Sequence, residues 1–149
     1  MRVGALQMDS PKASPVKAAD FVAALGHEGV EIECGYEVSE LALPLRAVQQ
    51  AIGILVDNAV DASPAGKPVR LSIHKHDGRM VFEVKDQGQG MSPEVVRRAG
   101  EPFFTTKPPG KGMGLGLFLV RLVAEKLGGS LRLESEIGKG TRAILELPE

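Results

Sequence analysis

Three short segments between residues 55 and 116 combine residue types that can bind a charged small molecule. The first is LVDNAVDA (55–62), which places Asn58 in the interior of a predicted helix, where asparagine is mildly unfavourable. The carboxamide oxygen of Asn58 is a hard ligand that suits Mg²⁺, a cation that keeps waters and phosphate oxygens as its other ligands. Taken alone, Asn58 also fits a solvated helix residue.

The second segment is DQGQG (86–90), which directly follows a predicted strand. A carboxylate fixed at a strand end, as Asp86 would be, can accept a hydrogen bond from the exocyclic amine of adenine. A partly buried hydrogen bond to a charged group contributes about 1.5–3 kcal/mol. Gly88 and Gly90 would allow the backbone to lie against a flat ring, although a plain glycine-rich turn is the alternative.

The third segment, GKGMGLG (110–116), runs into a predicted helix. Its glycine amides and the positive end of the helix dipole would attract phosphates. Lys107 and Lys111 flank these glycines and can reach a terminal phosphate, or can stand as solvated loop lysines. The segment is not a Walker loop, because no Gly-Lys-Ser/Thr occurs. A proline-containing loop rather than a strand precedes it, which excludes a dinucleotide fingerprint.

The hydrophobic pattern predicts the elements that must position these segments. Pro44 is expected to open a long helix, since proline costs no hydrogen bond in the first turn, and SPAGKP (63–68) ends it. Asp77-Gly78 is a strong signal for a hairpin turn. The other expected elements are a helix over 16–25, strands over 29–38, 69–76, 80–85, 130–136 and 142–147, a short helix capped by Ser92, and a helix over 115–127. This order predicts an α/β (α+β) two-layer sandwich, with helices on one face of a mixed, largely antiparallel sheet.

Length and composition limit the possible classes of protein. The 149 residues suit one domain, which we expect over 16–149 behind a flexible lead-in over 1–15. A net charge of −1 gives no bulk electrostatic reason to bind nucleic acid. No apolar run approaches the ~20 residues that a membrane span needs. Cys34 is the only cysteine, which excludes an internal disulfide and fits a cytoplasmic protein.

In their order and spacing, these segments resemble the motifs of the ATP-binding catalytic domain of sensor histidine kinases, in the family shared with gyrase, Hsp90 and MutL. The resemblance covers about residues 16–148. Residues 50–62 resemble the family's Asn box, 86–90 its first glycine box, 101–107 its Phe box, 112–117 its second glycine box and 138–141 its closing Gly-Thr. The Thr-Thr-Lys end of the Phe box is similar to kinases of the nitrogen-regulatory and redox-responsive type. The family fold, the Bergerat α/β sandwich, agrees with the predicted element order.

The resemblance implies a role for each residue of interest. Asn58 should bind Mg²⁺, Asp86 should read adenine, and Thr141 should support the Asp86 site. Residues 105–115 should form a mobile lid over ATP, with the Phe pair before them anchoring its base. The residues expected to bind nucleotide are Asp86, Gly88, Gly90, Met91, Phe104, Gly112, Met113, Gly114, Leu115, Gly116 and Thr141, and those expected to act in catalysis are Asn58, Lys107 and Lys111.

By the same resemblance, the protein is a histidine kinase catalytic domain that uses ATP and Mg²⁺. It would transfer the γ-phosphoryl group to a His on a separate helical-hairpin dimerisation domain, for which the 149 residues are expected to have no room. Phosphoryl transfer depends mainly on positioning and charge neutralisation, which suits a site of glycine amides, lysines and a metal. The expected partners are that His-bearing domain and a response regulator, and the chain by itself is expected to be monomeric.

Two features depart from the family pattern. Ile54 occupies the position, one helical turn before Asn58, at which family members usually carry a polar residue. Because an apolar side chain cannot orient a water there, a nucleotide-binding regulatory module without phosphotransfer is an alternative function. An anti-sigma-type serine kinase, which shares the same boxes, is a further alternative, although the Phe-Phe-Thr-Thr-Lys and Gly-Met-Gly-Leu-Gly-Leu segments resemble it less closely. His27 imitates the start of a phosphoacceptor motif, but Gly29 and a strand pattern follow it in place of a long helix. We therefore do not expect His27 to accept phosphate.

Overall fold

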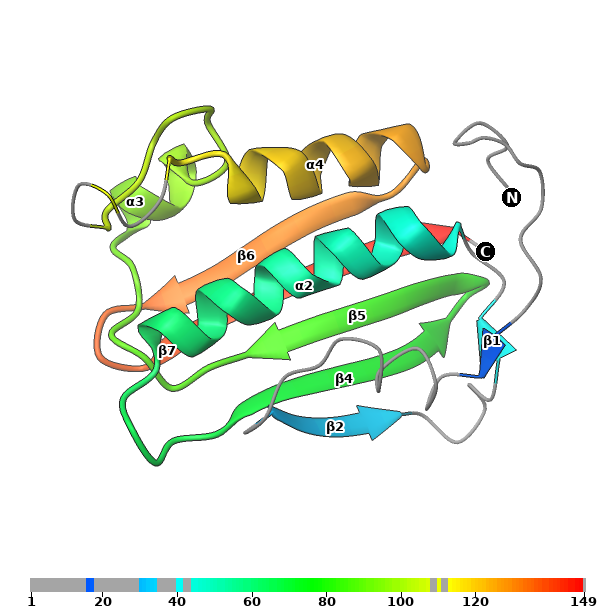
Figure 1. Ribbon diagram of the computed structural model, residues 1–149, viewed down its shortest axis with the longest axis horizontal. Helices are drawn as coiled ribbons and strands as arrows, with labels where there is room; N and C mark the ends of the chain where they lie inside the picture. Colours follow the sequence, from blue (N-terminus) through cyan, green and yellow to red (C-terminus); the bar gives the residue numbers. More distant parts are fainter. Residues whose placement is uncertain are drawn as a thin grey trace.

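A five-stranded sheet with the order β2-β4-β5-β7-β6 forms the centre of the computed structural model (Figure 1). Its strands are β2 (Val30–Cys34), β4 (Val69–His76), β5 (Arg79–Lys85), β6 (Ser130–Glu136) and β7 (Gly140–Pro148). Strand β2 pairs with β4 in parallel, and the other three pairs are antiparallel. The predicted Asp77-Gly78 turn joins β4 to β5, and both residues have positive φ, as a two-residue hairpin requires. The mixed, largely antiparallel sheet is therefore confirmed.

The structure describes residues 16–17, 30–34, 40–41, 44–107, 110 and 113–148. Two short strands, β1 (Val16–Lys17) and β3 (Glu40–Leu41), pair with each other outside the main sheet. The helix predicted over 16–25 is therefore wrong at its first two residues, because β-branched valine fits a strand pair better than a helical turn. Residues 18–25 and the expected lead-in over 1–15 lie outside the described residues.

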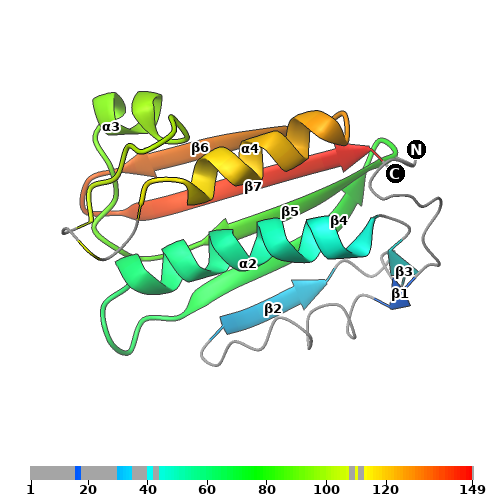
Figure 2. The same ribbon diagram turned by 45° about the horizontal axis from the view of Figure 1, so that its top comes forward.

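Three helices accompany the main sheet: α2 (Leu45–Ala62), α3 (Pro93–Arg98) and α4 (Gly116–Lys126). Helices α2 and α4 cross the same face of the sheet side by side, and no described helix covers the opposite face (Figures 1 and 2). This is the two-layer sandwich that the sequence predicts. Within the part of the chain that the structure describes, no helix is both long and apolar enough to cross a bilayer.

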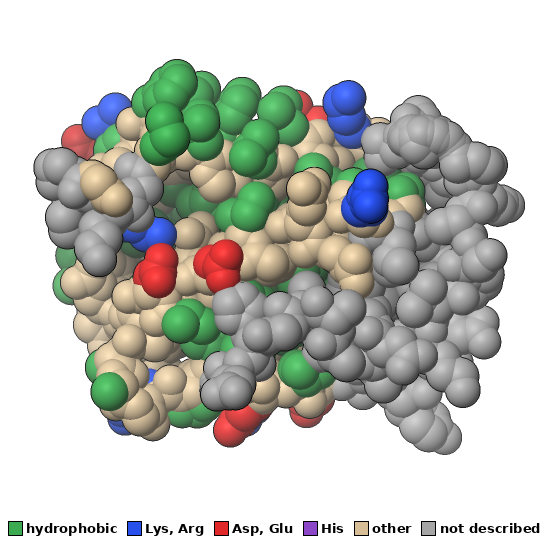
Figure 3. All heavy atoms as spheres, in the orientation of Figure 1, with side chains coloured by type: hydrophobic (Ala, Val, Ile, Leu, Met, Phe, Trp, Pro, Cys, Tyr) green, Lys and Arg blue, Asp and Glu red, His purple; other side chains and the backbone are tan. Residues whose placement is uncertain are grey.

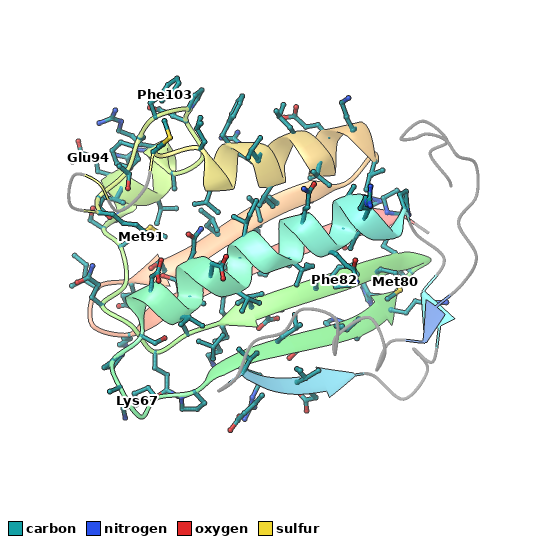
Figure 4. The ribbon with its side chains drawn as sticks, in the orientation of Figure 1. Lys67, Met80, Phe82, Met91, Glu94 and Phe103 are labelled. Atoms are coloured by element: carbon teal, nitrogen blue, oxygen red, sulfur yellow. The ribbon has the colours of Figure 1, made fainter. Side chains whose placement is uncertain are left out.

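The hydrophobic core lies between the two long helices and the inner face of the sheet. Apolar residues recur at helical spacing along α2, and alternate residues of β4, β5 and β7 meet them. Phe82 and Met80 of β5 lie in this layer (Figure 4). The largest fully buried side chains are Phe82, Ile52, Leu55, Leu71, Ile73, Met80, Leu145 and Leu147. Burial of each such side chain stabilises the fold by about 1.5–3 kcal/mol, which fixes α2 over the sheet.

The ends of several elements meet at one end of the molecule. Helix α2 and strand β5 both end there, and α4 begins there, beside the turn between β6 and β7 (Figure 1). The fold thus gathers the end of α2, the segment after β5 and the loop before α4. The predicted cap of α3 lies at this end too, where Ser92 Oγ accepts a hydrogen bond from the N–H of Val95 at 3.2 Å.

Candidate functional site

Asp86 is a buried charged residue at the end of β5. It is 5% exposed, and its Oδ1 accepts hydrogen bonds from the N–H of Gly88 at 2.8 Å and the N–H of Thr141 at 3.2 Å. The N–H of Asp86 donates in turn to the carbonyl of Thr141 at 2.9 Å. Among the described residues, none donates to the second carboxylate oxygen, Oδ2. Because a buried charged oxygen without a donor is costly, Oδ2 is available to a donor on a ligand.

Ser135 of β6, which no sequence motif indicated, links several parts of this site. Its hydroxyl accepts from the N–H of Met91 at 2.8 Å, donates to the carbonyl of Gly140 at 3.0 Å, and lies 2.7 Å from Thr141 Oγ1. Because the single proton of Ser135 goes to Gly140, the Thr141 hydroxyl is the donor in the third bond. No pattern in the sequence indicates Ser135, and only the pairing of β6 with β7 places it opposite Thr141.

Close backbone packing requires the glycines of the segment after β5. A Cβ on Gly88 would collide with the carbonyl oxygen of Ala62, at the end of α2. Gly90 has a φ of 74°, and a Cβ on it would collide with the carbonyl of Glu136, at the end of β6. The segment is thus pressed between α2 and the β6–β7 turn, and this packing places Asp86. From the sequence we expected these glycines to lie against a ring, and the structure gives a packing reason for them.

Asn58 lies half-buried on α2, in contact with Lys107. The ammonium Nζ of Lys107 donates to Asn58 Oδ1 at 3.4 Å and to Asp61 Oδ2 at 2.8 Å. Asp61 follows Asn58 by one turn of the helix, so one ammonium group bridges two consecutive turns of α2. The fold thereby brings together two of the residues expected in catalysis, which are 49 positions apart in the sequence.

The oxygens around Lys107 form a place for a cation. Asn58 Oδ1 is a hard oxygen donor of the kind that Mg²⁺ prefers, and it shares one positive charge, that of Lys107, with the Asp61 carboxylate. Within the described ranges, no group of three His, Cys, Asp or Glu side chains could hold a metal ion by itself. The Asn58 oxygen therefore fits a magnesium ion that takes its remaining ligands from water and phosphate oxygens.

The side chains of Ile54 and Asn58 both lie near the start of α4. A Cβ on Gly116 would lie 3.0 Å from Ile54 Cγ2 and 4.0 Å from Asn58 Nδ2. Ile54 is half-buried and packs against the hydrophobic core. It therefore provides an apolar contact for the N-terminus of α4, and the absence of a side chain at Gly116 allows the two helices to approach closely beside Asn58.

The loop between α3 and α4 is anchored by the Phe pair. The N–H of Phe103 donates to the carbonyl of Gly114 at 2.8 Å. Phe104 packs under Arg98, whose guanidinium lies 4.2 Å from the ring centroid in a cation–π contact. The Phe103 side chain projects outward and is 71% exposed (Figure 4). The backbone of Phe103 therefore joins the start of this loop to its end at Gly114, and the ring of Phe104 holds the loop against the end of α3.

Exposed apolar side chains gather along α4 and the loop before it (Figure 3). They are Phe103, Met113, Leu119 and Leu122. Met113, which was expected to bind nucleotide, is itself largely exposed, whereas Leu115 at the N-cap of α4 is half-buried. Lys111 and Gly112, expected at the phosphate end of the site, lie outside the described residues, as does His27.

The face of the sheet away from the helices carries ion pairs next to the site. Arg142 donates to Glu83 at 2.9 and 3.2 Å and pairs with Glu134 at 3.1 Å. The hydrogen bond to Glu83 raises the pKa of the Arg142 guanidinium above its ordinary value. A cavity of about 270 Å³ at this end of the sheet is lined by Lys85, Glu134 and Arg142 together with Thr141.

Comparison with known proteins places the chain in a family. The family model described as "Histidine kinase-, DNA gyrase B-, and HSP90-like ATPase" matches residues 45–149. The chain belongs to this ATPase family. The match begins at the first residue of α2. It therefore includes every helix and strand that carries a residue of the candidate site in this histidine kinase-like ATPase domain.

Curated relatives of this ATPase domain are sensor kinases. The chain is 39% identical over 106 residues to histidine protein kinase DivJ of Caulobacter vibrioides, and this alignment covers 69% of this chain and 18% of the relative. It is 35% identical over 134 residues to sensor kinase CckA of Brucella abortus, which covers 80% of this chain and 14% of the relative. The chain therefore spans less than a fifth of the length of these two kinases.

Solved structures of histidine kinases share the fold of this ATPase domain. The mycobacterial sensor histidine kinase MprB has a TM-score of 0.75 at 27% identity, covering 91% of this chain and 96% of that one. Full-length ShkA in complex with AMPPNP has a TM-score of 0.74 at 27% identity, covering 91% of this chain and 30% of that one. The expected Bergerat sandwich is therefore confirmed.

Proposed function

We propose that this chain binds ATP with Mg²⁺ and transfers the γ-phosphoryl group to a His side chain on a separate dimerisation domain. Membership of the histidine kinase-like ATPase family supports the proposal, as does the likeness to DivJ and CckA. ShkA, which shares the fold at 27% identity, was solved in complex with AMPPNP. The chain then needs two partners, a His-bearing domain and a response regulator that receives the phosphoryl group.

The observation that carries the proposal is the carboxylate of Asp86. Two backbone N–H groups fix Oδ1, and Oδ2 is left as a buried acceptor with no donor among the described residues. An ionised carboxylate only accepts hydrogen bonds, so the matching ligand group is a donor such as the exocyclic amine of adenine. The Thr141 hydroxyl, which donates to Ser135, keeps lone pairs for a second donor beside it.

The triphosphate is proposed to lie between α2 and the start of α4. Lys107 and the backbone at Gly114 and Gly116 would hold the phosphates, and Asn58 would hold Mg²⁺. The metal, when bound, supplies charge neutralisation on the phosphate oxygens. The part of this chain is to bind and orient the triphosphate and exclude water, while the attacking nitrogen comes from the His of the partner domain.

Transfer of label from ATP to a separately prepared His-bearing hairpin domain tests this function. At ATP concentrations below saturation, Asp86→Asn should lower the transfer about tenfold to 150-fold, because Asn presents an N–H₂ donor where adenine also presents a donor, and about 1.5–3 kcal/mol of binding is lost. Asp77→Asn is the matched control, since it removes the same charge in the β4–β5 turn and asparagine tolerates the φ of 52° there. Wild-type protein that binds no ATP, or full transfer by Asp86→Asn, would contradict the proposal.

Ile54 favours a second function, that of a nucleotide-binding regulatory module without phosphotransfer. Its apolar side chain packs beside Asn58, at the start of α4, where it cannot orient a water. The same assay separates the two functions: tight ATP binding without transfer by the wild type, with transfer gained in Ile54→Asn, supports the regulatory module. Ile54→Val is the control that keeps this position apolar.

We further propose that residues 16–149 act as one monomeric domain in the cytoplasm, where ATP and response regulators occur. The family match over 45–149 supports the larger part of this boundary, and the pairing of β1 with β3 supports its beginning. Light scattering of the purified chain measures its mass in solution, and a dimer mass would contradict the monomeric state.

A further inference from the structure

One ammonium group, that of Lys107, connects the loop before α4 to two acceptors on α2. It lies 2.8 Å from Asp61 Oδ2 and 3.4 Å from Asn58 Oδ1. The side chain of Lys107 is 34% exposed and that of Asp61 is 58% exposed, so solvent screens the pair. An ion pair as exposed as this one contributes little to the stability of the fold. It is weak enough for Lys107 to exchange it for another anionic partner.

Lys107 occupies the position that the proposed function assigns to the metal. Asn58 Oδ1 is the oxygen proposed to bind Mg²⁺, and Lys107 is the cation proposed to bind the phosphates. A divalent ion on Asn58 Oδ1 and the ammonium of Lys107 would repel each other strongly at such short range. Lys107 and Mg²⁺ therefore compete for the oxygen of Asn58, and the triphosphate offers Lys107 a stronger partner than Asp61.

We propose that Asp61 is a positioning residue that makes nucleotide binding depend on the metal, an inference that rests on the proposed function. Without metal, Asp61 keeps Lys107 on Asn58, and the Asp61 carboxylate also repels the triphosphate. With metal on the Asn58 oxygen, Lys107 is released to the triphosphate, and the metal balances the charge of Asp61. Asp61 thus discriminates the magnesium complex of ATP from ATP alone.

Calorimetric titration of ATP, once with Mg²⁺ and once with excess EDTA, tests this role. In EDTA, Asp61→Asn should bind ATP about threefold to tenfold more tightly than the wild type, because the repulsion is gone and Lys107 is free. With Mg²⁺ the change should be smaller than about twofold, so the ratio of the two dissociation constants falls. Asn is similar in size to Asp at this exposed helix position, and Asp77→Asn, the matched control, should leave the ratio unchanged.

Lys107→Met separates positioning from simple charge repulsion. If Asp61 acts through Lys107, the gain from Asp61→Asn in EDTA should shrink by about half or more, in free energy, in the Lys107→Met background. An equal gain in both backgrounds, or an unchanged ratio in Asp61→Asn, overturns this inference and leaves ATP binding and the proposed function intact. Wild-type protein that binds ATP in neither buffer overturns the proposed function and this inference together.

Discussion

At the scale of single residues, the Asp86 site depends on backbone contacts as much as on charge. The N–H groups of Gly88 and Thr141 hold the carboxylate, and glycine packing places both of them. A Cβ on Gly88 would collide with Ala62, and one on Gly140 would collide with the carbonyl of Asp86. Small changes in these glycines should therefore affect both stability and ligand binding.

Gly88→Ala should destabilise the protein by about 1–3 kcal/mol, because the added methyl group collides with backbone at the end of α2. It should also weaken ATP binding, since the N–H of Gly88 orients Asp86. Gly53→Ala is the control: nothing lies within 4 Å of a Cβ there, and alanine in a helix interior stabilises by about 0.5–1 kcal/mol. Urea unfolding measures both changes, and effects of the same sign would contradict the packing explanation.

Ser135→Ala should cost about 1–3 kcal/mol of stability, because the N–H of Met91 and the carbonyl of Gly140 lose their partner in a part-buried place. Ser130→Ala, at the exposed start of the same strand, should change stability by less than about 0.5 kcal/mol. Thermal unfolding of the two variants provides the comparison. Equal stability of the two would mean that the Ser135 network does not support the site.

Single residues differed in how far the sequence could indicate them. Asp86 and Asn58 could be singled out, because a carboxylate after a strand beside glycines and an amide within a helix are unusual in those places. Ser135 and Asp61 could not, since a serine in a strand and an acid on an exposed helix face are ordinary. Only the pairing of β6 with β7, and an ion pair across 46 positions, reveal what these two contact.

At the scale of elements, successive residues of strand β7 point to opposite faces of the sheet. It pairs with β5 on one side and β6 on the other, so that Thr141 faces the site and Arg142 faces the open side. The ion pairs of Arg142 with Glu83 and Glu134 therefore join three neighbouring strands directly behind the site.

Arg142→Met should destabilise the protein by less than about 1 kcal/mol, since the side chain is 42% exposed and its pairs are screened. The loss should shrink further in ~1 M salt, where the Debye length is about 3 Å. Folding raises the pKa of Arg142, so the charged guanidinium stabilises the folded state at every pH below the ordinary arginine pKa. This contribution to the free energy of unfolding is lost only as the pH rises through the higher pKa of the folded state. Urea unfolding between about pH 6 and 9 should show no Arg142-dependent slope, and a slope there would contradict this account.

Elements with a strong period could be predicted, and those without one could not. Helix α2 has apolar residues at helical spacing throughout, and the hairpin of β4 and β5 has a clear turn, so both agree with the sequence. Strands β1 and β3 have two residues each, too few to show any alternation, and their pairing arises from a contact distant in the sequence.

At the scale of the whole molecule, the site is built by neighbours in space that are distant in the chain. Central strands β5 and β7 lie side by side, although α3, α4 and β6 all come between them in the sequence. The sequence predicts the layers of this fold, because the number and type of elements determine them. The register that sets Thr141 against Asp86 is a tertiary property: the family resemblance implied that Thr141 supports the Asp86 site, but no pattern in the strands specifies the register.

Saturating ATP with Mg²⁺ should stabilise the whole domain, because the ligand binds the folded state. At a ligand concentration of about 100 times the dissociation constant, the gain is about 2.7 kcal/mol. Differential scanning fluorimetry should show this as a rise in melting temperature that Asp86→Asn loses and Asp77→Asn keeps. A rise of equal size in both variants would mean that ATP binds somewhere other than Asp86.

The hydrogen bond between Asp86 and Thr141, which are 55 positions apart, also closes a long loop of the chain. This closed segment contains α3, the loop before α4, α4 itself and β6. The conformational entropy lost in closing such a segment grows only slowly with its length. Most of that loss therefore depends on whether the contact between its two ends is made. A ligand that donates a hydrogen bond to Asp86 Oδ2 would help to keep the two ends of this segment together. Amide hydrogens of α4 and β6 should then exchange more slowly when the ligand is bound, even where they lie far from it.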